Sequence, residues 1–355
     1  MDNNVKEQMN MTEIYDVTII GGGPAGLYAA FYAGLRNMKT KIIEFQSELG
    51  GKVRLFPEKK IWDIGGQPPI TGDAFIKQLI EQGLTFHPTV HVETKVERIV
   101  DQLDGTFHIE TNKGTHMSRS VIVAVGGGII QPQKLQVAGV PKEDVQNMHY
   151  VVREFEQFRD QVVLISGGGN TAVDWANELH GIAKEIHVVY RGENLSAHEA
   201  QVEQVMKHAT VHTQTQITQV HANENTNCIE NVTIEQAAGE KIISVDHMIV
   251  SHGFDLDQTL QYDVSIPLER IDHAIASTAT GKTDMPGIFV AGDIAKYEGK
   301  VNLLVGCFQD AVNAVNGAKL HIEPTASHVA MVSSHNERVQ KRIPVETRKN
   351  EKSLA

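Results

Sequence analysis

Residues 21–26 read Gly21-Gly22-Gly23-Pro24-Ala25-Gly26 and directly follow the apolar run 17–20. A second turn of this kind, at residues 167–172, reads Gly167-Gly168-Gly169-Asn170-Thr171-Ala172 and follows the apolar run 162–165. In such a strand–turn–helix pattern the first glycine permits a sharp bend, the second lets the backbone approach a pyrophosphate, and a small third residue lets helix and strand pack closely. Two copies predict two dinucleotide-binding units in one chain, held together so that electrons can pass between their ligands.

Each turn should hold a pyrophosphate on the free N–H groups at the N-terminus of the helix that it opens. In the first turn the pattern falls on Gly21, Gly23 and Gly26, with Pro24 and Ala25 between them. In the second turn the corresponding residues are Gly167, Gly169, Asn170 and Ala172.

The residues that follow each turn distinguish the two ligands. The strand expected at 41–43 ends in Glu44, where a carboxylate would accept hydrogen bonds from ribose hydroxyls, which favours an unphosphorylated ribose such as that of FAD or NAD. The strand expected at 186–190 is followed by Arg191 and has no acid at its end, so this cation would meet a 2′-phosphate. We therefore expect NADP(H) rather than NAD(H) on the second turn.

Strand and helix signals alternate along the chain, which is typical of a doubly wound α/β fold. We expect two Rossmann-like dinucleotide-binding domains, the second inserted into a discontinuous first domain. The expected bounds are 1–13 for a flexible N-terminal arm, 14–125 and 255–323 for the first domain, 126–254 for the second, and 324–355 for a C-terminal extension.

Composition and charge exclude several classes of protein. The 355 residues carry a net charge of −12, which argues against a general nucleic-acid binder. Cys228 and Cys307 form no CxxC and the 17 histidines show no metal-ligand spacing, so we expect no metal and no disulfide framework. We interpret His149, His187 and His198 as packing or surface residues. With no apolar run of bilayer length and no signal-peptide core, we expect a cytoplasmic protein without membrane contact.

Residues 283–293, Thr-Asp-Met-Pro-Gly-Ile-Phe-Val-Ala-Gly-Asp, resemble the second FAD fingerprint of two-dinucleotide-binding-domain flavoproteins. In that family the final aspartate, here Asp293, accepts a hydrogen bond from a ribityl hydroxyl of FAD. Residues 48–52 resemble the family's turn beneath the flavin, with Lys52 in place of the usual Gln.

Residues 167–175 and the pair Tyr190-Arg191 resemble the NADPH domain of thioredoxin reductases. Those enzymes place a redox-active CxxC shortly before the second glycine turn, whereas this chain reads Asn-Met-His-Tyr-Val-Val-Arg-Glu at 147–154. Without a dithiol, electrons cannot be relayed through a protein disulfide and must leave the flavin directly. Over nearly its whole length the chain is similar to the thioredoxin-reductase-like ferredoxin–NADP+ reductases of bacteria, which also carry a long C-terminal extension.

The resemblance implies FAD on the first domain, NADP(H) on the second, and a homodimer. It places an aromatic side chain, here Phe56, on one flavin face and a residue of the extension near the other, with His328, Ser333 and His335 as candidates. The expected FAD-binding residues are Gly21, Gly23, Pro24, Ala25, Gly26, Glu44, Gly51, Lys52, Phe56, Asp63, Gly126, Asp293 and Asn302. The expected NADP-binding residues are Gly167, Gly169, Asn170, Ala172 and Arg191.

The function implied is that of an FAD-dependent oxidoreductase that moves electrons between NADPH and ferredoxin. Hydride would pass from C4 of NADPH to flavin N5 and electrons would then leave singly, so we expect positioning of the two rings and no catalytic acid or base. The helix N-terminus near Asn302 would stabilise negative charge on the flavin.

Two basic segments are candidates for docking an acidic ferredoxin or flavodoxin. The first carries Lys52, Arg54, Lys59 and Lys60, and the second carries Arg338, Lys341, Arg342, Arg348, Lys349 and Lys352. Two alternatives stay open: an NADPH-dependent flavin reductase of flavodoxin, quinone or oxygen, and a non-catalytic sensor of the NADP(H) and FAD redox state.

Overall fold

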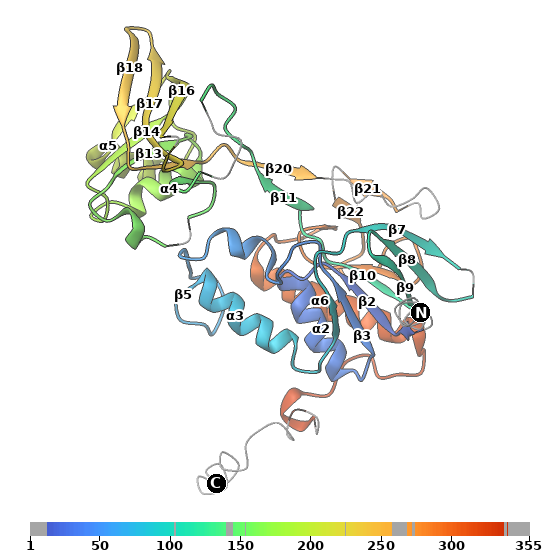
Figure 1. Cartoon of the computed structure of the whole chain (residues 1–355). Helices are drawn as coiled ribbons and strands as arrows, with labels where there is room; N and C mark the ends of the chain where they lie inside the picture. The colour runs from blue at the N-terminus through green and yellow to red at the C-terminus, as the bar shows by residue number, and fades with distance from the viewer. Residues whose placement is uncertain are drawn as a thin grey trace, which may run out of the picture. The chain divides into compact units, whose positions relative to one another are not determined.

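The computed structural model describes residues 13–102, 104–139, 145–152, 154–223, 225–257, 268–271, 274–336 and 339. Its contacts divide the chain into two compact units. Unit 1 comprises the described residues up to Arg54, residues 60–129 and those from Leu256 onward, and unit 2 comprises residues 55–59 and 130–255. Each unit is an α/β structure built on its own parallel sheet (Figure 1).

Unit 1 is built on a five-stranded sheet in which all neighbouring strands are parallel. In spatial order the strands are β23 (Ile288–Val290), β10 (Val121–Val123), β2 (Val17–Ile20), β3 (Thr40–Ile43) and β6 (Thr89–His91). Parallel neighbours require a crossover connection, and helix α2 (Pro24–Leu35) supplies it between β2 and β3. The glycine turn therefore lies where the central strand ends and α2 begins.

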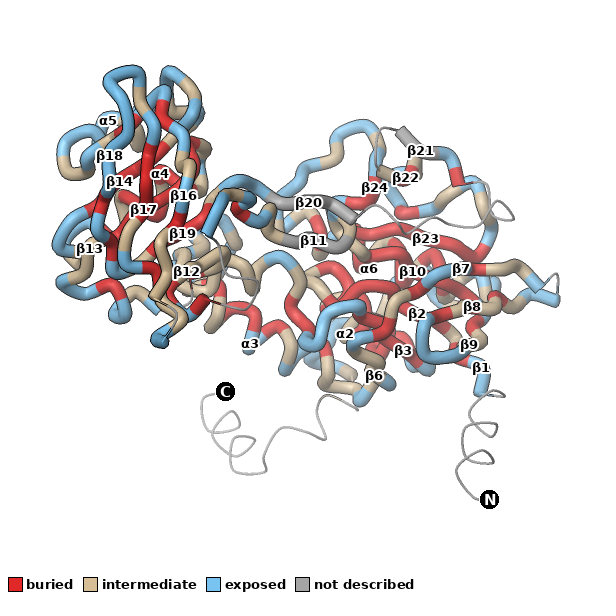
Figure 2. Tube along the Cα trace, turned by 45° about the horizontal axis from the view of Figure 1, so that its top comes forward, coloured by how far each residue is buried: buried red, intermediate tan, exposed pale blue. Residues whose placement is uncertain are grey.

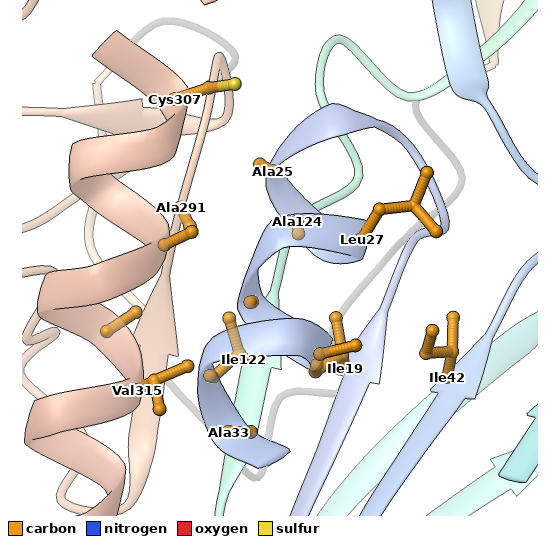
Figure 3. Packing of buried hydrophobic residues seen from close by; sticks show 14 of the residues in the cluster. Ile19, Ala25, Leu27, Ala33, Ile42, Ile122, Ala124, Ala291, Cys307 and Val315 are labelled. Atoms are coloured by element: carbon orange, nitrogen blue, oxygen red, sulfur yellow. The ribbon is translucent and has the colours of Figure 1, made fainter. Parts of the chain in front are cut away.

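Side chains alternate between the two faces of this sheet, because successive residues of a strand point to opposite sides. Ile19 and Ile42 lie in an apolar layer beneath helices, and their neighbours Ile20 and Ile43 lie in the layer on the opposite face (Figure 3). The helices are α2, α3 (Gly72–Gly83) and α6 (Leu304–Ile322). The other face is covered by β7 (Val96–Asp101), β8 (Phe107–Thr111) and β9 (Gly114–Ser118), with β1 (Ile14–Tyr15) beside β9.

Unit 2 repeats this plan. Its five parallel strands are, in spatial order, β12 (Met148–His149), β19 (His247–Val250), β13 (Val162–Ser166), β14 (Glu185–Val189) and β15 (Thr210–His212). Helices α4 (Asn170–Glu178) and α5 (Glu199–His208) contribute to the core on one face. The antiparallel strands β16 (Gln216–Asn223), β17 (Cys228–Gln236) and β18 (Gly239–Ser244) cover the other face. Figure 2 shows the buried strands at the centre of each unit.

Short elements complete the described chain. The strands are β4 (Lys60–Ile61), β5 (Ile70–Thr71), β11 (Ile129–Pro132), β20 (Phe254–Asp257), β21 (Arg270–Ile271), β22 (Ala274–Ala276) and β24 (Ala295–Lys296), and the 3₁₀ turns are η2 (Gly51–Leu55), η3 (Glu156–Phe158) and η4 (Ser333–His335). Strands β11 and β20 pair where the chain passes from one unit to the other and back.

The described part of the C-terminal extension is attached to the C-terminal end of α2. The guanidinium of Arg36, a residue only 7% exposed, donates to the Ser327 carbonyl. The Ala330 N–H donates to the Tyr32 hydroxyl at 3.1 Å, and Asn336 Nδ2 donates to the Leu35 carbonyl at 3.3 Å. Three independent contacts therefore fix the start of the extension to one helix.

One short segment belongs to a different unit from the one expected. Residues 55–59 lie within the predicted first domain in sequence, but they pack in unit 2. The ring of Phe56 stacks on Trp175 with centroids 6.4 Å apart, and the ammonium of Lys59 pairs with the Asp174 carboxylate. The remaining boundaries between the two units lie at 129/130 and 255/256.

Across the described ranges, no helix combines the length and the apolar character that crossing a membrane requires.

Replacement of Gly167 by alanine should destabilise unit 2. Its φ of +145° is rarely adopted by residues with a side chain, and a Cβ would overlap the Ser251 carbonyl oxygen. We expect a loss of roughly 2–4 kcal/mol in the free energy of unfolding. Urea unfolding followed by circular dichroism measures this loss.

The matched control is Gly169→Ala, two residues along the same turn. Gly169 has a φ of −85° and open space at its Cβ position, so the free energy of unfolding should stay within about 1 kcal/mol of the unmodified protein. Equal losses in the two variants would contradict the steric account of the turn.

Candidate functional site

The candidate site of unit 1 lies at the carboxyl edge of its parallel sheet. Because all five strands run in the same direction, their carboxyl ends meet at one edge, where ligands of such folds bind. Gly21 directly follows β2, Glu44 directly follows β3, Gly126 follows β10, and Asp293 follows β23 after a two-residue turn. Four expected FAD-binding residues from distant parts of the sequence are thereby brought to one edge.

The first glycine turn is shaped by the neighbouring strand. The Gly21 N–H donates to the Ile43 carbonyl at 2.8 Å, and its φ is +107°. A Cβ at Gly21 would overlap the Ala124 carbonyl oxygen, and a Cβ at Gly26 would overlap the Gly21 oxygen. The strand end, the turn and the first turn of α2 are packed so closely that only glycine fits at both positions.

A second backbone segment closes against this turn. Gly51 has a φ of +58°, and a Cβ there would lie 2.8 Å from the Gly23 Cα. The Gly50 N–H donates to the Gly22 carbonyl at 2.8 Å, which holds the two segments together. Both backbones can therefore approach a ligand together, without side chains between them.

The N-terminus of α2 is open to an anion. Gly23 is its N-cap, Pro24 is at its first position, and no side chain caps it. The N–H groups of a helix's first turn have no partners within the helix, and its dipole favours negative charge there. An uncapped helix start beside two side-chain-free backbones fits the pyrophosphate of a dinucleotide.

Glu44 is buried under the turn rather than pointing freely to solvent. The residue is 8% exposed, its Oε2 accepts the Gly22 N–H at 2.6 Å, and its Oε1 accepts the Gln46 N–H at 2.8 Å. A carboxylate oxygen has two lone pairs, so each oxygen still has acceptor capacity for a ribose hydroxyl. Glu44 thus shapes the turn and keeps the capacity expected of it.

Asp293 and Asn302 lie at the same edge. Both are exposed, Asp293 after Gly292 at the end of β23 and Asn302 immediately before Leu303, the N-cap of α6. No side chain caps α6 either. Two uncapped helix starts, those of α2 and α6, therefore belong to unit 1.

Three further expected FAD-binding residues lie on other elements. Lys52 is exposed on η2, and Asp63 is exposed between β4 and β5. Phe56 belongs to unit 2, where its ring lies on Trp175. The stacking of Phe56 on a flavin stays a prediction.

Unit 2 carries the same turn geometry. The Gly167 N–H donates to the Val189 carbonyl at 2.9 Å, as Gly21 does to Ile43, and a Cβ at Gly167 would overlap the Ser251 oxygen. Gly169 is the N-cap of α4 without a side-chain cap. Ala172 is completely buried, which meets the requirement for a small third residue.

The residue in the place of Glu44 is Tyr190. Each is the first residue after its strand, and each backbone N–H donates to the next strand, Glu44 to His91 at 2.8 Å and Tyr190 to His212 at 2.9 Å. The Tyr190 ring fills the space beside Gly168, where a Cβ would overlap it. Arg191 follows and is exposed. No carboxylate therefore stands under the second turn.

Asn170 holds the loop that faces the second turn. Its Oδ1 accepts the His198 N–H at 3.1 Å, and the Ser196 N–H donates to the Gly168 carbonyl at 2.7 Å. Asn170 thus has a defined positioning contact, in addition to the nucleotide contact expected from sequence.

His252 joins this group, although the sequence reasoning missed it. Its Nε2 lies 2.7 Å from Ser166 Oγ, and burial, together with the charge of Arg191, lowers the pKa of His252. The ring is therefore neutral at neutral pH. Its position directly after the strand at 247–250, beside Gly253, was the available signal.

The three histidines that we interpret from sequence as packing or surface residues all lie in unit 2. His149 Nε2 lies 3.0 Å from His247 Nδ1, and burial lowers the pKa of His149 to about 4. His187 is buried 3.2 Å from His212, and His198 is exposed at the N-cap of α5. Within the described ranges, no group of three or more His, Cys, Asp or Glu residues is arranged to hold a metal ion.

Comparison with known proteins identifies relatives along nearly the whole chain. The model of the pyridine nucleotide-disulphide oxidoreductase family matches residues 15–318. Ferredoxin–NADP reductase 2 of Exiguobacterium sibiricum is 49% identical over 339 residues, which is 94% of this chain and 96% of the relative. Ferredoxin–NADP reductase 1 of Bacillus cereus is 50% identical over 339 residues, 94% of this chain and 97% of the relative.

Solved structures support the fold. Thioredoxin reductase of Lactococcus lactis superposes with a TM-score of 0.67 at 22% identity, covering 87% of this chain and 99% of that one. Thioredoxin reductase of T. acidophilum gives a TM-score of 0.69 at 21% identity, covering 88% and 99%.

Replacement of Glu44 by glutamine should loosen the first turn. A glutamine side chain has one acceptor oxygen for the two N–H groups of Gly22 and Gln46, so one buried donor loses its partner, at about 1–3 kcal/mol. Amide hydrogen exchange, measured by mass spectrometry on a peptide spanning these residues, should accelerate by about 5- to 100-fold. Glu48→Gln is the control, because Glu48 is an exposed acid whose pair with Arg54 contributes little. Unchanged exchange in E44Q would show that the carboxylate does not hold the turn.

Proposed function

This chain belongs to the pyridine nucleotide-disulphide oxidoreductase family and, within it, to the ferredoxin–NADP reductases, and from this we propose that it moves electrons between NADPH and ferredoxin through FAD. The observation that carries the proposal is that the two glycine turns share their backbone geometry but differ in the residue that follows the adjacent strand. One has a carboxylate beneath it, Glu44, and the other has Tyr190 followed by Arg191.

We assign FAD to unit 1, as the discontinuous domain. The residues fit this cofactor because Gly23 and Gly51 present bare backbone beside the uncapped start of α2, which suits a pyrophosphate. Glu44 would accept from the adenosine ribose, and Asp293 from the ribityl chain. The uncapped α6 start after Asn302 would face the electron-rich end of the flavin.

We assign NADP(H) to unit 2, as the inserted domain. The N–H groups at the start of α4 would bind its pyrophosphate, and Arg191 would pair with the 2′-phosphate. Tyr190 occupies the place of the acid that favours NAD(H), so no carboxylate at that position repels the phosphate. His252, with its lowered pKa, is neutral at neutral pH and brings no charge to this position.

The protein's own residues act by binding and orientation. A bound flavin accepts hydride from a nicotinamide and passes electrons on singly. The turns fix the two pyrophosphates, Glu44 and Arg191 select the riboses, and Asp293 orients the ribityl chain. Positioning of this kind supplies most of the rate of a hydride transfer, so no acid or base is needed.

The cysteines offer no alternative route for the electrons. Cys228 is half-buried in unit 2, and Cys307 is buried in unit 1, where burial raises the pKa of its thiol to about 12. A thiol with so little thiolate is a poor nucleophile. Electrons from a bound flavin would therefore pass to a separate carrier.

We propose a homodimer in which the extension of one chain serves the flavin of its partner. The extension begins at the Arg36 end of α2, whereas the pyrophosphate turn lies at the Gly23 end. Twelve helical residues separate the two ends by roughly 18 Å. His328, Ser333 and His335 belong to the described part of the extension and stay candidates for covering a flavin.

The first basic segment offers two lysines for docking ferredoxin. Lys52 and Lys60 are exposed, but Arg54 pairs with Glu48 at 2.7 Å, and Lys59 pairs with Asp174. Lys59 is thus engaged within unit 2, and Lys60 is the cation of this segment better suited to a test of docking. The second segment, from Arg338 to Lys352, lies outside the described residues.

Rapid mixing of the FAD-loaded protein with NADPH and with NADH tests the function. We expect NADPH to bleach the flavin rapidly and repeatedly when ferredoxin is present as acceptor. Flavodoxin, quinone and oxygen are assayed in parallel, and faster turnover with one of these would identify a different reductase. Tight nucleotide binding with slow bleaching would identify a sensor instead.

The same assay includes Arg191→Gln. Loss of a charged partner for the 2′-phosphate removes about 1.5–3 kcal/mol, which should raise the KM for NADPH about 10- to 100-fold and leave NADH nearly unchanged. Arg159→Gln is the control, because Arg159 is an exposed arginine of unit 2 paired with Glu156. A preference for NADH in the unmodified protein would contradict the role of Arg191.

Charge reversal at Lys60 tests the docking surface. Lys60→Glu should raise the KM for ferredoxin roughly three- to tenfold at low salt, and the difference should shrink as salt screens the charges. Lys77→Glu, an exposed lysine on α3, is the control. If both variants respond equally, or if salt has no effect, the docking site lies elsewhere.

A further inference from the structure

A buried carboxylate on α6 has no part in the site described above. Asp310 is 2% exposed, accepts two hydrogen bonds and forms one ion pair. The hydrogen-bond donors are the Gly292 N–H at 3.1 Å and the Tyr297 hydroxyl at 2.6 Å, and the ion pair is with the Lys300 ammonium at 2.8 Å. The side chain of Lys300 is itself only 5% exposed, so the ion pair is withdrawn from water.

A gain in stability does not by itself explain an ion pair buried this deeply. Removing two charges from water is unfavourable, and replacing a buried ion pair by apolar residues of similar volume is often neutral or stabilising. The Lys300–Asp310 pair is distinguished instead by the parts of the fold that it connects.

The three partners of Asp310 come from three consecutive pieces of chain at the carboxyl edge of the unit 1 sheet. Gly292 lies in the turn after β23 and directly precedes Asp293, Tyr297 follows β24, and Lys300 lies two residues before Asn302. One carboxylate thus holds both the turn that presents Asp293 and the loop that leads into α6.

The start of α2 is packed into the same arrangement. A Cβ at Gly292 would lie 3.0 Å from the Ala25 Cβ and 3.8 Å from the Cys307 Cβ. Figure 3 shows Ala25 and Cys307 near the N-terminal ends of the adjacent helices α2 and α6. The Gly292 turn is therefore wedged between the two uncapped helix starts, and Asp310 fixes it from the α6 side.

We propose that Asp310 is a positioning residue of the FAD site, which holds the Gly292–Asp293 turn and, with Lys300 and Tyr297, the loop entering α6 in one geometry before FAD binds. This inference rests on the proposed function, because it presumes FAD on unit 1. Asp310 acts through Asp293 and the start of α6, and it makes no contact with the cofactor itself. Preorganisation of this kind strengthens binding, since the ordering of the two segments does not have to occur on association.

The test compares K300M/D310N with K300M/D310L. Both variants lack the ion pair and have a side chain that branches at Cγ at position 310, but only asparagine keeps an oxygen for the Gly292 N–H. We expect K300M/D310L to bind FAD at least tenfold more weakly than K300M/D310N, in titrations of the apoprotein followed by flavin fluorescence. The K300M/D310L apoprotein should melt roughly a few degrees lower, because its Gly292 N–H has no acceptor, so both titrations are made well below either melting temperature. Equal FAD affinities in the two variants would overturn the proposal.

The two variants are then compared again in an Asp293→Ala background. If Asp310 acts by placing Asp293, the difference between asparagine and leucine should fall to less than about threefold, because the positioned carboxylate is absent. A purely structural role predicts that the difference persists, and persistence would overturn the proposal.

Should K300M/D310L not fold, amide hydrogen exchange in K300M/D310N decides the question. Residues 297–303 should exchange faster than in the unmodified protein, because Lys300 no longer holds the loop, while residues 288–293 stay protected. Unchanged exchange at 297–303 would overturn the proposal.

Failure of the unmodified apoprotein to bind FAD would overturn the proposed function and this inference with it, whereas FAD binding without a variant effect overturns the inference alone.

Discussion

The close approach of a neighbouring strand to the first glycine of each turn is the constraint on which both sites depend. At Gly21 the Ala124 carbonyl occupies the space of a Cβ, and at Gly167 the Ser251 carbonyl does the same. The chain can then turn from a central strand directly into a helix whose N-terminus lies at the sheet edge. The uncapped starts of α2 and α4 and the residues after the adjacent strands, Glu44 and Tyr190, gain their positions from this packing.

The two units differ most at the residue that follows the second strand. In unit 1 this residue is Glu44, which is hydrogen-bonded beneath Gly22, and in unit 2 it is Tyr190, whose ring packs beneath Gly168. The backbone hydrogen bonds around the two positions are the same. A common scaffold thus distinguishes its ligands by one side chain, with a carboxylate on one turn and an aromatic ring followed by Arg191 on the other.

The sequence predicts those features that depend on short, local patterns. Apolar runs ending in glycines predicted the two parallel sheets and the turns, because a strand, a tight bend and a helix leave a signal within about ten residues. Residues 55–59 carry no such periodicity, and their place in unit 2 depends on Asp174 and Trp175, more than 100 residues away. Asp310 is one of several polar residues on its helix, and only the folded chain shows that Gly292, Tyr297 and Lys300 converge on it.

The unequal burial of the two thiols has a practical consequence. Cys307 is buried with its pKa raised to about 12, whereas Cys228 is half-buried on β17, in the other unit. Thiol-directed reagents attack the thiolate at accessible positions. A maleimide dye should therefore attach at Cys228 alone, so that the native sequence yields a molecule with a single spectroscopic label, confined to unit 2.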